Sequence, residues 1–197
     1  MMTLASARSW PLSFKRHCAA AKTGEHGFKF ASAPFMENLR EMVLNEPANV
    51  TFGDLSREVE ELLREGVVAQ RRDRERADRL FREALALAPN ELPIYYCLYK
   101  VQTRMGRLDA AAAIARQGME EAARQAGWSL DPREWPEAKA SEGPGRFAVF
   151  TLKALSFIEL KRGNREMALA NLDHLARLDP SGGVGWPVVL ALAEGID

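Results

Sequence analysis

A spacing of small and large apolar residues recurs along this sequence with a period of about 34 residues, and it restricts the chain to one kind of architecture. In ADRLFREALALAPNE (77–91), the intervals between Ala77, Phe81 and Ala84 place all three on one face of a helix. Pro89 then ends that helix. Ala111 stands one period after Ala77, in GRLDAAAAIARQG. A third copy near the C-terminus has the corresponding residues Ala168, Leu172, Ala176 and Pro180.

A single insertion accounts for the spacing between the copies. The turn glycines of the second and third copies are separated by the same interval as their alanines. The interval between the glycines is one period plus a remainder. The interval between the prolines of the first and third copies is two periods plus the same remainder. Repetition at such a period indicates helical hairpins that stack and bury each other's apolar faces. The pairs are Gly106 and Gly163, Ala111 and Ala168, and Pro89 and Pro180.

With these residues the chain resembles the tetratricopeptide repeat (TPR) family over about residues 58–180. The resemblance implies an all-α, right-handed superhelical stack of about three hairpins. Departures occur at Tyr99, where a small residue belongs, and in the second copy, which has Ala115 and Gly118 in place of the bulky and small pair and lacks its proline. Further matching residues are Tyr95, Leu98, Leu152, Leu155 and Ser156.

The expected repeat domain covers residues 35–197, with a capping helix at each end. FMENLREMVL (35–44) places four apolar residues on one face and predicts the N-terminal cap, while PVVLALAEG (187–195) predicts the C-terminal cap. NEPANVTFGD (45–54) predicts a loop between the first cap and the first hairpin.

The 23-residue insertion, at about 126–148, contains several prolines and glycines and therefore cannot form one helix. It also contains Trp128 and Trp135. Long loops inside a compact domain are often functional, so these tryptophans are candidate partner-binding residues. The alternative is that both rings only attach the loop to the adjacent hairpins.

Residues 1–34 are expected to form a disordered leader outside the fold. They contain five basic residues and one acid, Glu25, a composition that also fits a transit peptide or a start codon upstream of the working one near Met36. The remainder carries 22 bases against 26 acids, and this net charge of −4 argues against a nucleic-acid ligand. Two cysteines without a CxxC pair favour a cytoplasmic, reducing location.

Sequence motifs for catalysis are missing, so we expect neither an enzyme nor a bound cofactor or metal. SGGVG (181–185) is interpreted as a turn rather than a dinucleotide-binding loop. His174 is expected on the surface, because its neighbour Asp173 does not share its helix face. Cys97 lies in an apolar helix and predicts a packed thiol rather than a nucleophile.

RRDRERADRLFR (71–82) has six arginines with three acids interleaved. Mixed charges at helical spacing usually form a solvated face with side-chain ion pairs. The alternative is a patch that binds an acidic partner.

In the TPR family, partners bind the concave side, which the first helix of each hairpin lines. The resemblance therefore implies partner-binding roles for two sets of residues, in which aromatic rings stand beside lysines. Such a surface suits an extended or helical segment with acidic and apolar residues. Alternatively, Phe150 and Phe157 belong to the core. The sets are Tyr96, Lys100 and Thr103, then Phe150, Lys153, Phe157 and Lys161.

These features favour a non-catalytic protein–protein interaction module, an adaptor or assembly factor that binds a peptide segment in a concave helical groove. Chaperone tails are unfavoured partners, because Leu62, Gly66 and Cys97 replace the asparagines of the family's carboxylate clamp. An enzyme with an unrecognised site and an RNA-binding helical repeat are alternatives. YYCLYK, ARQAGW and GPGRFA resemble small bacterial TPR proteins of nitrogen-fixation gene neighbourhoods, which implies a further alternative as an accessory protein of such a system.

Overall fold

The computed structural model describes residues 55–137 and 143–195, and within these ranges the chain is all-helical. Seven α-helices and one short 3-10 helix occur there, with no strand, which confirms the predicted all-α class. The expected leader, the cap at 35–44 and the loop at 45–54 lie outside the described residues.

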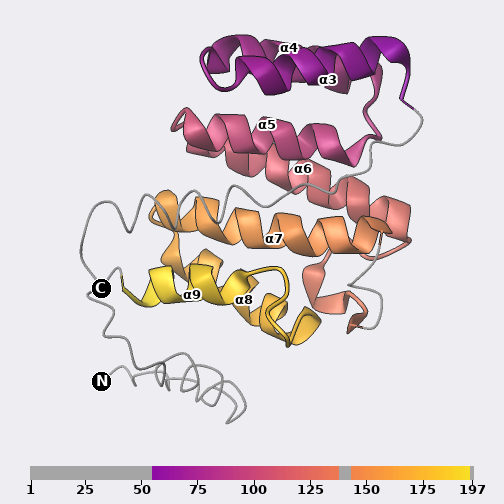
Figure 1. The fold of residues 1–197 in the computed structure, drawn as a ribbon. Coiled ribbons are helices and arrows are strands. Elements are labelled where there is room, and N and C mark those ends of the chain that lie inside the picture. Colours follow the sequence, from indigo (N-terminus) through magenta and orange to yellow (C-terminus); the bar gives the residue numbers. More distant parts are fainter. Residues whose placement is uncertain (1–54, 138–142, 196–197) are drawn as a thin grey trace, which may run out of the picture. The chain divides into compact units, whose positions relative to one another are not determined.

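The helices follow one another as antiparallel neighbours joined by short turns, except after α6 (Figure 1). Helix α9 occupies the position predicted for the C-terminal cap. The bounds are α3 Arg57–Ala69, α4 Arg74–Leu87, α5 Leu92–Arg104, α6 Leu108–Ala126, η1 Pro132–Glu134, α7 Gly143–Lys161, α8 Arg165–Leu178 and α9 Trp186–Glu194.

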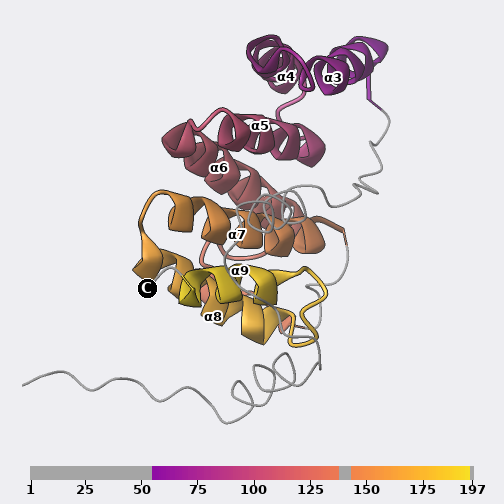
Figure 2. The same ribbon diagram turned by 60° about the vertical axis from the view of Figure 1, so that its left-hand side comes forward.

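Each helix packs against the next one in the chain, from α3 through to α9. In addition, α5 contacts α7, and α7 contacts α9 (Figure 2). The first helices of the second and third hairpins are therefore in contact with one another.

Local signals in the sequence begin and end the helices. The Ser56 hydroxyl accepts a hydrogen bond from the Val59 amide at 3.4 Å, and a carboxylate oxygen of Asp73 accepts one from the Arg76 amide at 2.9 Å. The predicted turn glycines, Gly106 and Gly163, have φ of 75° and 82°. Glycine adopts this left-handed conformation without the penalty that a Cβ would bring.

Small residues allow the two helices of a hairpin to approach closely. Four of the five alanines of the repeat are completely buried, and the Phe81 and Leu172 side chains are at most 1% exposed. Close approach of the backbones with large side chains filling the remaining space gives dense interior packing. The buried alanines are Ala77, Ala84, Ala111 and Ala168.

Two glycines lie at especially close helix–helix contacts. A Cβ added to Gly66 of α3 would lie 2.3 Å from a ring carbon of Phe81 in α4. A Cβ added to Gly118 of α6 would lie 2.7 Å from the Cβ of Tyr95 in α5. Both distances are far below van der Waals contact. The aromatic residue therefore occupies space that the side chain of any residue other than glycine would need.

The segment predicted as an insertion, at about 126–148, is helical at both of its ends in the structure. Residues 143–148 belong to α7, and Ala126 still belongs to α6. Both helices have 19 residues, whereas α4 and α8 have 14 and α3 and α5 have 13. Part of the insertion therefore lengthens the two helices that it joins. Pro144 is tolerated because the first turn of a helix needs no intrahelical amide donor.

A buried carboxylate joins the second and third hairpins. The Glu159 side chain in α7 is completely buried and forms a salt bridge with Arg116 of α6. Arg162 donates to both Glu159 oxygens at 3.0 and 2.8 Å, and the Asn164 side-chain amide donates at 2.7 Å. Arg162 also forms a salt bridge with Asp109 at 2.7 Å. This Glu159 network fixes α6, α7 and the start of α8 to one another.

We predict that Gly66→Ala and Gly118→Ala each lower the melting temperature. Replacing a helical glycine with alanine normally gains about 1 kcal/mol, but overpacking a close contact costs about 1–3 kcal/mol. Gly118→Ala is the more costly change because the Tyr95 Cβ is fixed to its backbone. Gly183→Ala is the control, since a Cβ there meets only ordinary contacts at 3.5 Å. Unchanged or raised melting temperatures for both helical variants would contradict the close-contact argument.

We further predict that Glu159→Ala destabilises the protein by about 2–4 kcal/mol, because it leaves two arginines without their shared partner. The two arginines are partly exposed and can hydrate, which keeps the cost below that of a fully buried pair. Chemical denaturation measures the effect. The exposed Glu120→Ala is the control and should change stability by less than about 0.5 kcal/mol. Equal effects of the two variants would show that the Glu159 network contributes little.

Candidate functional site

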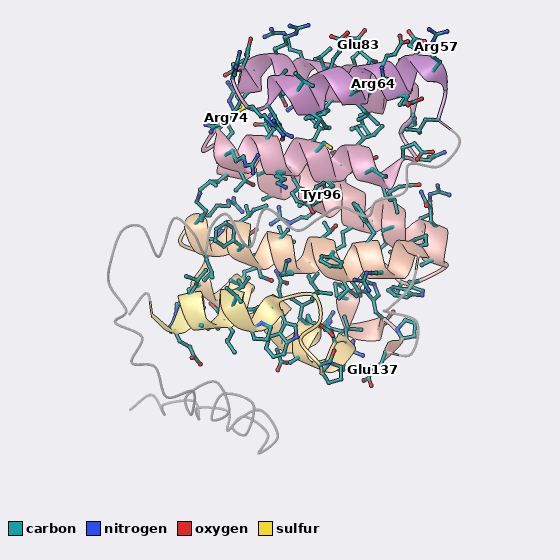
Figure 3. The ribbon with its side chains drawn as sticks, in the orientation of Figure 1. Arg57, Arg64, Arg74, Glu83, Tyr96 and Glu137 are labelled. Atoms are coloured by element: carbon teal, nitrogen blue, oxygen red, sulfur yellow. The ribbon has the colours of Figure 1, made fainter. Side chains whose placement is uncertain are left out.

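Helix α5 carries an aromatic residue paired with a lysine. The Lys100 ammonium donates a hydrogen bond to the Tyr96 hydroxyl at 2.9 Å and lies 4.9 Å from the centre of its ring. Tyr99 meets Tyr96 edge-on, with 5.5 Å between the ring centres. Figure 3 shows Tyr96 between the ribbons of α5 and α7. The two aromatic rings and the lysine of α5 therefore form one contiguous group.

Helix α7 carries the same chemistry over a longer stretch. The Phe150 ring lies close to two cations, with the Arg146 guanidinium 5.2 Å and the Lys153 ammonium 5.0 Å from its centre. Lys161 lies 5.8 Å from the Phe157 ring centre. At about 100° per residue, these five side chains occupy a stripe about 80° wide on one side of the helix.

The charges on α5 and α7 are strongly one-sided. Helix α5 contains no acidic residue, and α7 contains only Glu159. Glu159 lies about 160° around the helix from the centre of the stripe and is held by the Glu159 network. We call the stripe of α7 together with the Tyr96–Lys100 group of α5 the aromatic–basic face. It combines cations and rings, and the helices that form it contribute no acid to it.

Six of the seven groove residues predicted from the sequence belong to the two cation–ring groups, one on α5 and one on α7, and the structure corrects the exposure of three residues. Thr103 is buried, and its hydroxyl donates to the Tyr99 carbonyl at 2.7 Å, so it is part of the helix packing. Lys153 and Phe157 are each only 4% exposed. Lys153 is buried with its ammonium against the Phe150 ring. The residues that offer accessible surface on this face are Tyr96, Lys100, Arg146, Phe150 and Lys161.

In the described part of the inserted segment the two tryptophans pack on each other, and Arg177 of α8 binds the backbone of the segment. Trp135 is 1% exposed, and its indole N–H donates to the Ser129 carbonyl at 2.8 Å. The half-buried Trp128 packs against it, with ring centres 5.5 Å apart. Arg177 donates to the Trp135 carbonyl at 3.0 Å and forms a salt bridge with Glu137 at 3.5 Å (Figure 3). The burial of Trp135 and the contacts of Arg177 favour the attachment alternative for Trp135, whereas the contact of Trp128 is with the other ring of the same segment.

Arg177 also donates to the carbonyls of two residues in η1, at 2.9 and 3.2 Å. One guanidinium therefore binds three backbone carbonyls in and beside η1, those of Pro132, Arg133 and Trp135.

Burial shifts the pKa values of two side chains considered in the sequence analysis, Cys97 and His174. Burial raises the pKa of the Cys97 thiol to about 11, so the thiol stays protonated at neutral pH and is a poor nucleophile. Burial lowers the pKa of His174, which is half-buried rather than on the surface as predicted. In the part of the chain that the structure describes, no group of three or more His, Cys, Asp or Glu side chains could hold a metal ion.

Two residues of the aromatic–basic face, Arg146 and Tyr99, are not predicted from the sequence. Arg146 falls within the predicted insertion, although its spacing of four residues from Phe150 is the helical signal that could have found it. Tyr99 enters the sequence argument only as a departure from the repeat pattern, because a bulky residue stands where a small one belongs.

Comparison of the sequence with protein-family models gives no match, and comparison with curated proteins gives none either. Among the described residues, no helix is both long enough and apolar enough to cross a membrane. The candidate site therefore stands on its own geometry: an aromatic–basic face on two adjacent helices.

Proposed function

We propose that the chain is a TPR-like, non-catalytic interaction module that binds a protein segment across the aromatic–basic face of α5 and α7. The single observation that carries the proposal is the pairing of cations with aromatic rings on two helices in contact, on the side of α7 opposite its only acid. Three helical hairpins in sequence, with α9 after them, support a TPR-like arrangement.

The chemistry of the face specifies the partner. Aromatic rings provide a large apolar contact area at a low cost in side-chain entropy, and cations beside them attract acidic residues. A segment that alternates acidic and apolar residues would satisfy both. The pairing within each helix also orients the lysines before the partner arrives, which reduces the ordering cost of binding.

The burial of Lys153 and Phe157 gives the face a firm base. Both side chains are fixed by packing, so the accessible groups around them project from a rigid helix. Binding sites on rigid elements hold their geometry better than sites on loops. The attached insertion is the less suitable recognition element, because Trp135 would have to leave its packed position to contact a partner.

A peptide-display selection tests the proposal and does not require the partner to be known. The purified full chain is used to select from a random peptide library, and we expect enrichment of peptides that combine Asp or Glu with apolar residues. Selected peptides without such enrichment would contradict the proposed partner chemistry.

The decisive variant is Lys100→Glu with Lys161→Glu, which reverses two accessible charges of the face. We predict at least a tenfold loss of affinity for the selected peptides, roughly 1.4 kcal/mol or more, with the melting temperature nearly unchanged. Isothermal titration calorimetry and a thermal melt measure the two effects. Lys153→Glu is unsuitable because reversing the charge of a buried side chain would damage the fold.

Two controls separate the face from other surfaces. Arg57→Glu with Arg79→Glu makes the same change in net charge on α3 and α4 and should leave affinity within about twofold at physiological salt. Leu130→Ser removes an exposed apolar residue, 63% exposed, from the insertion. Loss of binding in Leu130→Ser with retention in Lys100→Glu/Lys161→Glu would place recognition on the insertion and overturn the proposal.

A further inference from the structure

The turns at one end of the first two hairpins enclose a polar hollow that the aromatic–basic face does not include. Its volume is about 570 Å³, and it lies between the α3–α4 turn and the α5–α6 turn. Figure 3 shows Arg74 at this end, and Arg57 at the opposite end of the same hairpin. The charged residues that line the hollow are Arg71, Arg72, Asp73, Arg74, Glu75 and Arg107.

Contacts between the two turns hold the walls of the hollow. Arg107, just before α6, forms a salt bridge with Glu75 of α4. Arg74 donates to the carbonyl of Arg104, at the end of α5, with a distance of 3.4 Å. The hollow is therefore framed by contacts between two hairpins.

The lining has an excess of positive charge. Four arginines face two carboxylates, which leaves a net charge of +2. Both carboxylates are already engaged, because Glu75 pairs with Arg107 and Asp73 accepts the Arg76 amide at the start of α4. Arg71 and Arg72 form no side-chain hydrogen bond or ion pair with the residues that the structure describes. They are the cations available to a ligand.

We infer that this hollow, the arginine hollow, binds a phosphate monoester. A phosphate monoester carries about −1.5 to −2 charges at neutral pH, which matches the excess of +2. Guanidinium groups bind two phosphate oxygens through two parallel hydrogen bonds. A carboxylate can accept the same two hydrogen bonds, but it carries only about half the negative charge. The arginine hollow is lined mostly by exposed side chains and is open to solvent, so the group that carries the phosphate can extend out of it.

RRDRERADRLFR has two interpretations, a solvated face with ion pairs or a patch that binds an acidic partner, and in our inference each interpretation applies to different residues. Arg76 pairs with Glu65 at 3.1 Å and Arg82 with Asp78 at 3.0 Å, as expected of a solvated face with ion pairs. Arg71 and Arg72 at the turn instead line the arginine hollow.

The test is an NMR titration of the full chain at constant ionic strength, with O-phosphoserine as the probe and serine as the comparison without a phosphate. We expect saturable shifts of the backbone amides of residues 71–75 and 107 with O-phosphoserine and none with serine. Arg71→Gln with Arg72→Gln should weaken binding about tenfold or more, because two charge-assisted contacts are lost. Folding should persist, since both side chains are exposed at a turn.

Arg57→Gln with Arg79→Gln is the matched control, because it also removes two positive charges but at positions that do not line the arginine hollow. Equal weakening by the two pairs would show general charge screening and overturn the inference, as would shifts that do not saturate. Equal binding of succinate would also overturn it, since a dicarboxylate has the charge without the phosphate.

A second arm identifies the source of the monoester. A short phosphoserine peptide and its unphosphorylated form are titrated beside O-phosphoserine. Tighter binding of the phosphopeptide supports a phosphorylated partner chain, whereas equal binding supports a small phosphate monoester. The Lys100→Glu/Lys161→Glu variant should bind O-phosphoserine normally. The inference about the arginine hollow and the proposed function can therefore be contradicted independently of each other.

Discussion

The structure depends on the close approach of the two helices within each hairpin. Gly66 lies under the Phe81 ring, and Gly118 lies against the Cβ of Tyr95, in places where any Cβ would clash. Completely buried alanines continue these contacts along the helices. Since the helices approach so closely on their inner sides, the large side chains on their other sides are available to pack between hairpins or to face outward.

This division of helix faces produces the candidate site. Helix α7 is fixed through Glu159 on one side, where Arg116 and Arg162 neutralise the carboxylate. The opposite side carries Phe150 and Phe157 with their cations. The acid of α7 thus stabilises the stack without reducing the positive charge of the aromatic–basic face. The same helix serves folding on one side and, in our proposal, recognition on the other.

Local patterns in the sequence are enough to predict the helices and their turns. The repeat period and the turn glycines Gly106 and Gly163 depend on neighbours in the chain, so periodicity and backbone conformation reveal them. The helical part of the insertion escapes these patterns, because Pro144 and the glycines beside it indicate a loop although the first turn of a helix accepts them. Features that depend on three or more elements escape such patterns. The Glu159 network needs α6, α7 and α8 together, and the arginine hollow needs turns from two different hairpins. The spacing of three residues on one helix predicts that Lys153 lies beside the Phe150 ring, but the burial of Lys153 also needs the packing of other helices, which spacing does not reveal.

The most direct test of the central claim is a double-mutant cycle between Gly66 and Phe81. Gly66→Ala is measured by chemical denaturation in the wild-type protein and in a Phe81→Leu background, where the ring is gone. We predict that Gly66→Ala costs stability in the wild type but costs little, or becomes stabilising, in the Phe81→Leu background, with a coupling energy of about 1–3 kcal/mol. The same cost in both backgrounds would contradict the claim that this close contact organises the hairpin.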